Sequence, residues 1–186
     1  PKNRLQETFD YLKQFLTDER LSKIEHFSQE SSDFVLPVME DVYQFRNAAA
    51  IVRSVEACGF HHVVALEEEN VFNPNLKVTK GAETWVKVEK MPNNLDSLKE
   101  IKNRGYKILA VSPENNATML PDYEVKEPIA LVFGTELEGV SDEILDFADE
   151  TLIFSKDDKL ATLILGGFNE YAKSLRNYSI YKFDSK

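Results

Sequence analysis

The stretch Ile129-Ala-Leu-Val-Phe-Gly-Thr-Glu-Leu-Glu-Gly-Val140 decides the fold class of this chain. Its first five residues, IALVF, are all apolar and predict a strand that is buried on both faces. Gly134 and Gly139 mark a turn after the strand, and Ser141 followed by two carboxylates is typical of a helix start. A buried strand that turns directly into a helix indicates an α/β protein with a parallel sheet.

Strand and helix patterns alternate through most of the remaining chain. Strands are expected at residues 34–38, 62–66, 85–88, 107–111 and 151–154. Helices are expected at residues 46–58, 95–104, 142–147 and 160–176, and a loop at residues 73–83. This alternation predicts one parallel sheet with helices packed against it.

The segment before the first strand follows a different pattern. Apolar residues at helical spacing over residues 5–28, with a break at Thr17-Asp18, predict two short helices. Thr17 or Asp18 is expected to cap the second helix. We therefore expect an N-terminal helical extension at residues 1–30 and one α/β domain at residues 31–186.

Composition limits the classes of function. The chain has 186 residues and a formal net charge of −10, so an RNA-binding surface would have to be a local patch on an acidic body. The basic residues Lys99, Lys102, Arg104 and Lys107 are interpreted as the solvated face of an amphipathic helix. One cysteine and three histidines predict neither an internal disulfide nor a metal site. No stretch approaches the roughly 18 apolar residues of a membrane span, so a cytoplasmic protein without a membrane partner is expected.

The turn at Gly134 to Gly139 is a candidate ligand site. In open α/β sheets ligands bind where strands end at their carboxyl edge, and glycine lets the backbone come close to them. The spacing matches neither GxGxxG nor GxxxxGK[ST], which argues against a dinucleotide loop or a P-loop. Glu136 and Glu138 either act as an acid/base pair or favour the N-terminus of the following helix, and the pattern leaves both interpretations open.

The helix expected at residues 46–58 carries a second candidate. On a helical wheel Asn47, Ala50, Arg53 and Ser54 share one face, which is small and polar apart from the arginine. Such a face lets a phosphate or a ribose approach the helix. The alternative, which the pattern by itself favours, is a solvated face with an ordinary exposed arginine.

Three motifs occur in order along the chain. Asn47 to Ser54 has the form N-x-x-A-x-x-R-[ST], Lys80-Gly-Ala-Glu-Thr-Trp85 has the form K-G-A-x-x-W, and Phe133 to Ser141 has the form F-G-x-E-x-x-G-[VLM]-S. In order and spacing they resemble the SpoU (TrmH-type) branch of the SPOUT RNA 2′-O-ribose methyltransferases, over almost the whole chain. Residues 11–20 also resemble the helical extension of the tRNA-specific members.

The resemblance implies a Rossmann-like parallel sheet with a C-terminal trefoil knot, and a homodimer whose active sites form at the subunit interface. It implies S-adenosylmethionine as the cofactor and methyl transfer to a ribose 2′-hydroxyl of RNA, with tRNA guanosine as the expected substrate. Arg53 and Asn47 would then be catalytic. Because the pKa of arginine lies above about 12, Arg53 suits orientation and charge stabilisation better than proton abstraction. The implied cofactor-binding residues are Val111, Gly134, Glu136, Gly139, Phe154, Thr162 and Leu163.

The last motif of the family is written unusually in this chain. The family pattern I-P-M-x-G-x-x-x-S-L-N-x-S-x-A aligns with residues 154–168, where Thr162 replaces the serine and Ile164 replaces the asparagine. Thr162 keeps a hydroxyl, whereas Ile164 offers neither a donor nor an acceptor. A second hypothesis therefore stands beside the first: a homologue with reduced or lost catalysis that binds RNA or protein.

Overall fold

The computed structural model describes residues 2–30, 33–57, 59–73, 76–113, 117–119, 122–135 and 138–153. The chain divides into two compact units, Pro1–Ser31 and Ser32–Lys186, and each is described by itself. The first unit contains α1 (Lys2–Leu12), the short 3-10 helix η1 (Lys13–Phe15) and α2 (Asp18–Glu30). Thr17 caps α2, because its Oγ1 accepts the Arg20 N–H at 3.3 Å.

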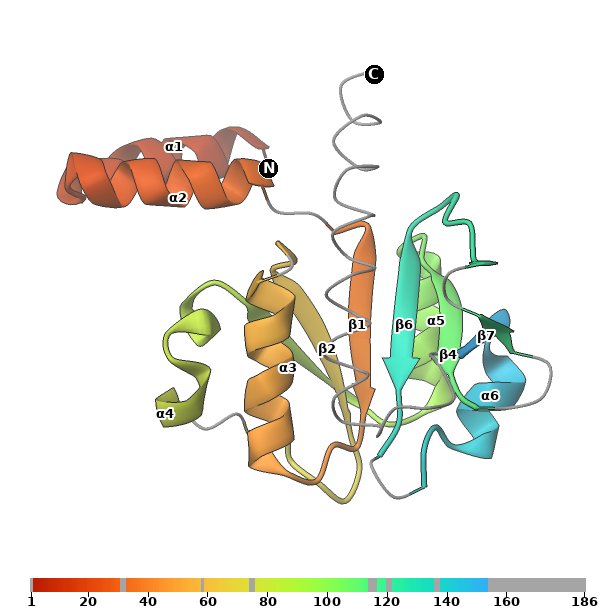
Figure 1. The fold of residues 1–186 in the computed structure, drawn as a ribbon. Coiled ribbons are helices and arrows are strands. Elements are labelled where there is room, and N and C mark those ends of the chain that lie inside the picture. The colour runs from red at the N-terminus through yellow and green to blue at the C-terminus, as the bar shows by residue number, and fades with distance from the viewer. Residues whose placement is uncertain are drawn as a thin grey trace. The chain divides into compact units, whose positions relative to one another are not determined.

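The second unit is built on a seven-stranded sheet in which every strand pair is parallel (Figure 1). The strands are β1 (Val35–Glu40), β2 (His62–Glu67), β3 (Lys87–Pro92), β4 (Lys107–Val111), β5 (Thr118–Met119), β6 (Ile129–Phe133) and β7 (Glu150–Ile153). Their order is β3-β2-β1-β6-β4-β7-β5. The IALVF strand, β6, lies between β1 and β4 and is completely buried, which confirms the α/β prediction.

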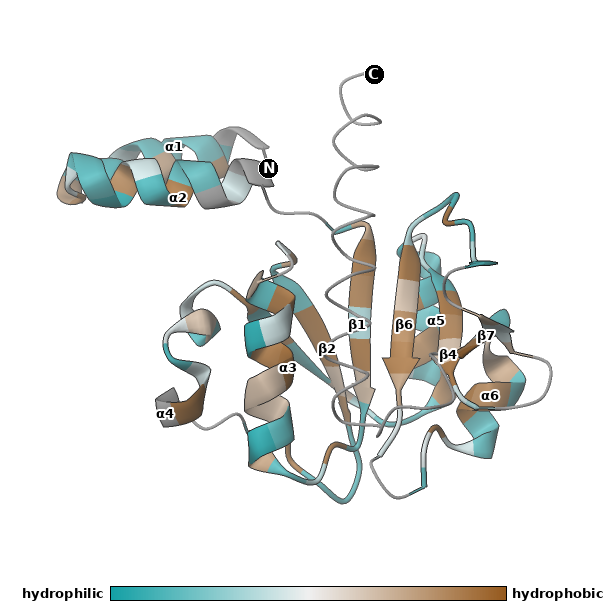
Figure 2. Ribbon diagram, viewed as in Figure 1, coloured by the Kyte–Doolittle hydropathy of each residue, from teal (hydrophilic) through white to brown (hydrophobic). Residues whose placement is uncertain are grey.

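Helices cover both faces of the sheet (Figure 1). They are α3 (Phe45–Ala57), α4 (Leu76–Thr79), the 3-10 helix η2 (Ala82–Thr84), α5 (Leu95–Asn103) and α6 (Asp142–Phe147). Ala48, Val52 and Val55 of α3 pack into the apolar cluster on one face. Leu98 of α5 and Ile144 of α6 pack into the cluster on the other face. Figure 2 shows the apolar residues concentrated on the strands between these two layers.

The sequence predictions for the sheet are least accurate at its two edges, because the edge strand β5 was not expected and the opposite edge around β3 was misplaced. Residues 73–83 are not one loop, because they contain α4 and the start of η2. The strand expected at residues 85–88 is β3, which begins two residues later and runs to Pro92. Only Met91 of this strand is buried, so an apolar pattern gives little sign of it. The helix expected at residues 160–176 and the knot lie outside the described residues.

None of the helices in the described ranges is long and apolar enough to cross a membrane.

The basic cluster at the end of α5 is neutralised by carboxylates. Lys99 pairs with Asp96, Lys102 with Asp149, Arg104 with Glu89 and Glu100, and Lys107 with Glu150. Lys99 and Lys102 lie exposed on α5, as expected for a solvated helix face, whereas Arg104 follows the helix and Lys107 begins β4.

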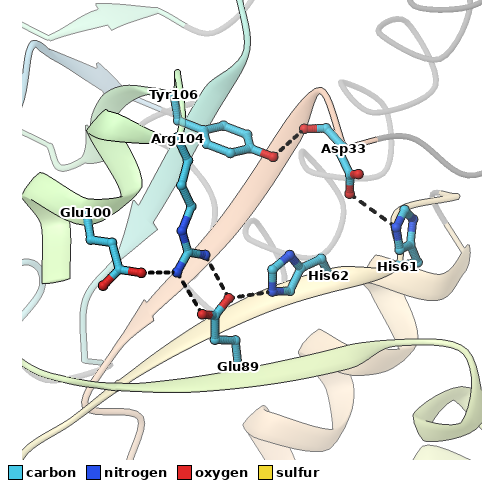
Figure 3. Close-up of polar contacts among 7 residues, drawn as sticks. All are labelled: Asp33, His61, His62, Glu89, Glu100, Arg104 and Tyr106. Atoms are coloured by element: carbon cyan, nitrogen blue, oxygen red, sulfur yellow. Dashed lines mark hydrogen bonds and ion pairs between the residues drawn. The ribbon is translucent and has the colours of Figure 1, made fainter. Parts of the chain in front are cut away.

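Glu89 on β3 is the centre of the polar network drawn in Figure 3. The guanidinium of Arg104 donates to both carboxylate oxygens of Glu89 at 2.8 Å, and His62 Nε2 lies 2.9 Å from the same carboxylate. The hydrogen bonds from Arg104 lower the pKa of Glu89 to about 2. The network thus ties the start of β2 and the end of α5 to β3.

Glu89→Gln should lower the free energy of unfolding at neutral pH by about 1–2 kcal/mol, allowing for partial solvent screening of the pair. The pKa of Glu89 is about 2 against an ordinary value of 4.5, so its stabilising effect is present above the ordinary value and is lost as pH falls towards 2. Urea unfolding at neutral and at acidic pH should show the difference between wild type and variant shrinking in acid. Glu100→Gln is the control, because that side chain is 58% exposed against 23% for Glu89 and its loss should cost less. A difference independent of pH would contradict this account.

Candidate functional site

The turn after β6 is closed by its own backbone. Thr135 and Gly139 form an antiparallel bridge in which the N–H of each donates to the carbonyl of the other at 3.0 Å. The N–H of Glu138 donates to Thr135 Oγ1 at 3.1 Å. Gly139 has a φ of +77°, which glycine adopts without strain. The turn is therefore a compact loop at the carboxyl end of the central strand.

Gly134 is required by the packing of this turn against itself. A Cβ at this position would lie 1.9 Å from both the carbonyl carbon and the oxygen of Gly139, and 2.1 Å from the Val140 nitrogen. These are backbone atoms, which cannot rotate away as a side chain can. From the sequence, Gly134 was expected to let a ligand come close to the backbone. The geometry shows that glycine is also required at this position by the packing of the turn, with or without a ligand.

Glu40 ties the turn to the end of β1. Its side chain is only 3% exposed, and its Oε2 accepts the N–H of Ser141 at 3.0 Å, just before α6 begins. The chain leaves β1 through α3 on one face of the sheet and β6 through α6 on the other. Neighbouring strands with divergent connections form the switch point where α/β sheets bind ligands. Glu40 was not among the predicted site residues, although a carboxylate at the end of the apolar strand VLPVME was a visible signal.

A cavity of about 600 Å³ lies on the other side of α3, away from the sheet. One wall comes from successive turns of this helix, through Ala50, Arg53, Ser54 and Ala57. Three of these four belong to the small, polar face expected from the sequence. The fourth predicted member, Asn47, lies half-buried in the first turn of α3 and is not among the lining residues.

The opposite wall is the segment with the K-G-A-x-x-W motif. Residues 79–82 and Trp85 line the cavity, with Lys80 at a φ of +53° and Gly81 at +97°. Glu83 holds this bend, because its carboxylate accepts hydrogen bonds from the buried Thr79 hydroxyl and the Gly81 N–H, which lower the pKa of Glu83. The first two sequence motifs thus face each other across one cavity.

The cavity contains two cations without a carboxylate partner. Arg53 and Lys80 are both exposed, and neither forms an ion pair within the described part of the chain. Among the described residues that line the cavity, Glu56 is the single carboxylate. The arginine is therefore exposed, as the alternative interpretation of this helix face holds, but it borders a cavity and is available to a ligand.

The other predicted site residues lie elsewhere. Val111 is half-buried at the end of β4, beside β6, and so shares the sheet edge that carries Gly134 and Gly139. None of the described residues of this edge turn lines the Arg53 cavity. Glu136, Phe154, Thr162 and Leu163 lie outside the described residues.

Comparison with known proteins relates the glycine turn after β6 and the cavity beside Arg53 to one family. Residues 35–163 match the model of the SpoU rRNA Methylase family. A tRNA (guanosine(18)-2'-O)-methyltransferase of Borreliella burgdorferi is 33% identical over 74% of this chain and 63% of its own length. The enzyme of that name from Aquifex aeolicus is 29% identical over 73% of this chain and 65% of its own length. The chain thus spans somewhat less than two thirds of these curated relatives.

Solved structures show the same architecture. The A. aeolicus TrmH/SpoU tRNA modifying enzyme superposes with a TM-score of 0.76 at 26% identity, over 87% of this chain and 85% of that one. The SpoU methyltransferase AviRb from Streptomyces viridochromogenes shares the fold with a TM-score of 0.65 at 18% identity, over 79% of this chain and 61% of that one. The family match covers the central strand, its glycine turn and the helix that carries Arg53. By this match and by its fold, the chain belongs to the SpoU rRNA Methylase family.

Proposed function

We propose that this chain is an S-adenosylmethionine-dependent RNA 2′-O-ribose methyltransferase that acts on tRNA guanosine as a cytoplasmic homodimer. Family membership and relatives named tRNA (guanosine(18)-2'-O)-methyltransferase support this proposal. The structural observation that carries it is Arg53, the arginine of the first motif, which borders an open cavity beside Lys80 with no carboxylate partner among the described residues.

In this proposal Arg53 acts on the ribose through its hydrogen-bond donors. A guanidinium has a pKa above about 12, so it holds its protons at neutral pH and is a poor general base. Its planar set of N–H groups can orient a ribose hydroxyl and a neighbouring phosphate, and can stabilise the negative charge that develops on the attacking oxygen. Asn47, half-buried in the first turn of α3, would hold the local geometry.

The cofactor would bind at the carboxyl edge of the sheet. The described residues there suit an adenosyl group, which needs backbone hydrogen-bond partners and apolar contacts: the glycine turn brings backbone to this edge, and Val111 is apolar and half-buried beside it. Gly134, Glu136 and Gly139 would form one side of the pocket, and Phe154, Thr162 and Leu163 of the proposed knot would form the other. When bound, S-adenosylmethionine supplies a methyl group on a positively charged sulfur.

The separation of the two regions supports a dimeric active site. The Arg53 cavity lies on the face of α3 that points away from the sheet, and no residue of the Gly134 turn that the structure describes lines it. Within a single chain, Arg53, which would contact the ribose, is therefore separate from the Gly134 turn, where the cofactor would bind. In the homodimer that we propose, the turn of one subunit would meet the Arg53 cavity of the other at the interface.

Calorimetric titration with S-adenosylmethionine and methyl transfer to an unmodified tRNA transcript test this function. We expect saturable cofactor binding and a 2′-O-methylated guanosine in nuclease digests of the tRNA, with dimers in sedimentation. The second hypothesis, a homologue with reduced or lost catalysis that binds RNA or protein, rests on the unusual last motif, and the relatives do not favour it. Absence of cofactor binding by the wild-type chain would contradict methyl transfer and favour that hypothesis.

A further inference from the structure

Trp85 lines the Arg53 cavity and has no role in the mechanism above. We propose that this cavity holds an unpaired nucleotide of the RNA substrate, with its base stacked on Trp85 and its phosphate between Lys80 and Arg53. This inference rests on the proposed function and extends it, because it names the part of the substrate that the cavity receives.

The size and walls of the cavity suit one nucleotide. Its volume of about 600 Å³ lies within the range of roughly 300–1,000 Å³ that is usual for small-molecule sites. Apart from Glu56, the α3 residues that line the cavity around Arg53 are small, namely Ala50, Ser54 and Ala57, so a flat ring can approach the helix beside them. A base inside a duplex has both faces covered by its neighbours, whereas an unpaired base can offer a face to an aromatic side chain.

The charges of the cavity suit a phosphate. Arg53 and Lys80 border the same space, and no carboxylate of the described residues neutralises either of them. The two cations form a local positive site on a chain with a net charge of −10. Most other cations of the described chain are paired: Lys13, Lys23, Lys90, Lys99, Lys102, Arg104, Lys107 and Lys126 each contact a carboxylate. Two unpaired cations at one site repel each other, and a bound phosphate relieves this repulsion through charge-assisted hydrogen bonds.

The backbone holds Trp85 at a defined place. Its N–H donates to the carbonyl of Ala82 at 3.0 Å, and the bend at Lys80 and Gly81 is fixed by the carboxylate of Glu83. Trp85 is half-buried, so part of its surface is accessible to solvent. A preorganised aromatic surface beside two cations is the arrangement with which proteins bind single-stranded nucleic acid.

Trp85 is the only tryptophan of the chain, so its fluorescence reports on this cavity. Titration of the full chain with short single-stranded RNA, and with guanosine 5′-monophosphate, should quench this fluorescence in a saturable manner. A fully paired RNA duplex should quench it much less, and inorganic phosphate alone should leave it nearly unchanged. Equal quenching by duplex and single strand would overturn the proposal.

Substitutions at Trp85 separate stacking from folding. Trp85→Leu keeps an apolar side chain but removes the aromatic face, and should raise the KM for tRNA about tenfold while kcat stays within about threefold. Trp85→Phe keeps a ring and should stay within about threefold of wild type in KM. An unchanged KM in Trp85→Leu would overturn the proposal.

Lys80→Ala tests the phosphate contact. It should weaken single-stranded RNA binding and reduce the slope of log affinity against log salt by about 0.7, as expected for one lost phosphate contact. Lys99→Ala removes the same charge from a lysine that is paired with Asp96 outside the cavity, and should leave the slope unchanged. Equal slopes in the two variants would overturn the role of Lys80.

Cofactor titration, Trp85 fluorescence and the KM of Trp85→Leu distinguish failure of the nucleotide site from failure of the proposed methyl transfer. Cofactor titration of Trp85→Leu should match wild type, because Trp85 does not belong to the sheet edge with the glycine turn. If wild type binds no cofactor yet single-stranded RNA quenches Trp85, methyl transfer fails and the nucleotide site stands. If methyl transfer proceeds with the same KM in Trp85→Leu, the function stands and the nucleotide site is overturned.

Discussion

Arg53→Ala should lower the kcat of methyl transfer to tRNA by about 10²–10³-fold without changing the affinity for S-adenosylmethionine. Removal of one preorganised donor that faces developing negative charge costs this much in other enzymes. The effect should fall on kcat, because the charge on the attacking oxygen develops only in the transition state. Single-turnover assays with saturating tRNA and cofactor, together with calorimetry, measure the two quantities separately.

Two further variants define what the arginine supplies. Arg53→Lys keeps the positive charge but loses the planar set of donors, and should recover only part of the rate. Arg46→Ala removes another exposed arginine of α3, which lies 5.9 Å from the Phe45 ring and does not line the cavity. That variant should stay within a few fold of wild type. If Arg53→Ala had the same kcat as wild type, its proposed role would be wrong.

Gly134→Ala should destabilise the protein by about 3 kcal/mol or more and abolish binding of S-adenosylmethionine. The added methyl group would lie 1.9 Å from the backbone carbonyl of Gly139, so the turn must open or β6 must shift. In either case the backbone at the carboxyl edge loses its position. Urea unfolding measures the first effect and calorimetric titration the second.

Gly105→Ala is the matched control. Gly105 has a φ of +96° and open space where its Cβ would be, so the substitution costs only backbone strain of roughly 1–2 kcal/mol. It follows α5, away from the glycine turn, and should leave cofactor affinity unchanged. If the two variants lost stability and cofactor affinity equally, the close approach of Gly134 to Gly139 would not explain the effect of Gly134→Ala.

Much of the fold could be predicted because its core strands are uniformly apolar. The bounds of β4, β6 and α6 agree with the sequence prediction to the residue. These elements lie in the middle of the sheet or directly against it. There the local sequence pattern and the buried environment both favour apolar residues at the same positions. At the two edges of the sheet burial is slight and the pattern is weak. The prediction misplaced β3 and missed β5 and α4.

The candidate site could be predicted only in pieces. The helical repeat places Arg53 beside Ala50 and Ser54 without any tertiary information, since residues three and four apart share a helix face. It gives no indication that Lys80 and Trp85 lie across a cavity from them. The hydrogen bond from the Ser141 N–H to Glu40 could not be predicted either, because these residues are 101 positions apart along the chain.

The class of the sheet, the glycine turn after IALVF and the small, polar face around Arg53 follow from local sequence, because apolar runs and helical spacing involve neighbouring residues only. What these features contact depends on the tertiary structure. It set Gly134 against the backbone of Gly139, brought the buried Glu40 to the start of α6, and placed Lys80 and Trp85 opposite Arg53. Such contacts depend on the order of the strands in the sheet and on the paths of the loops between them. They join residues that are far apart in the chain, so local sequence does not reveal them.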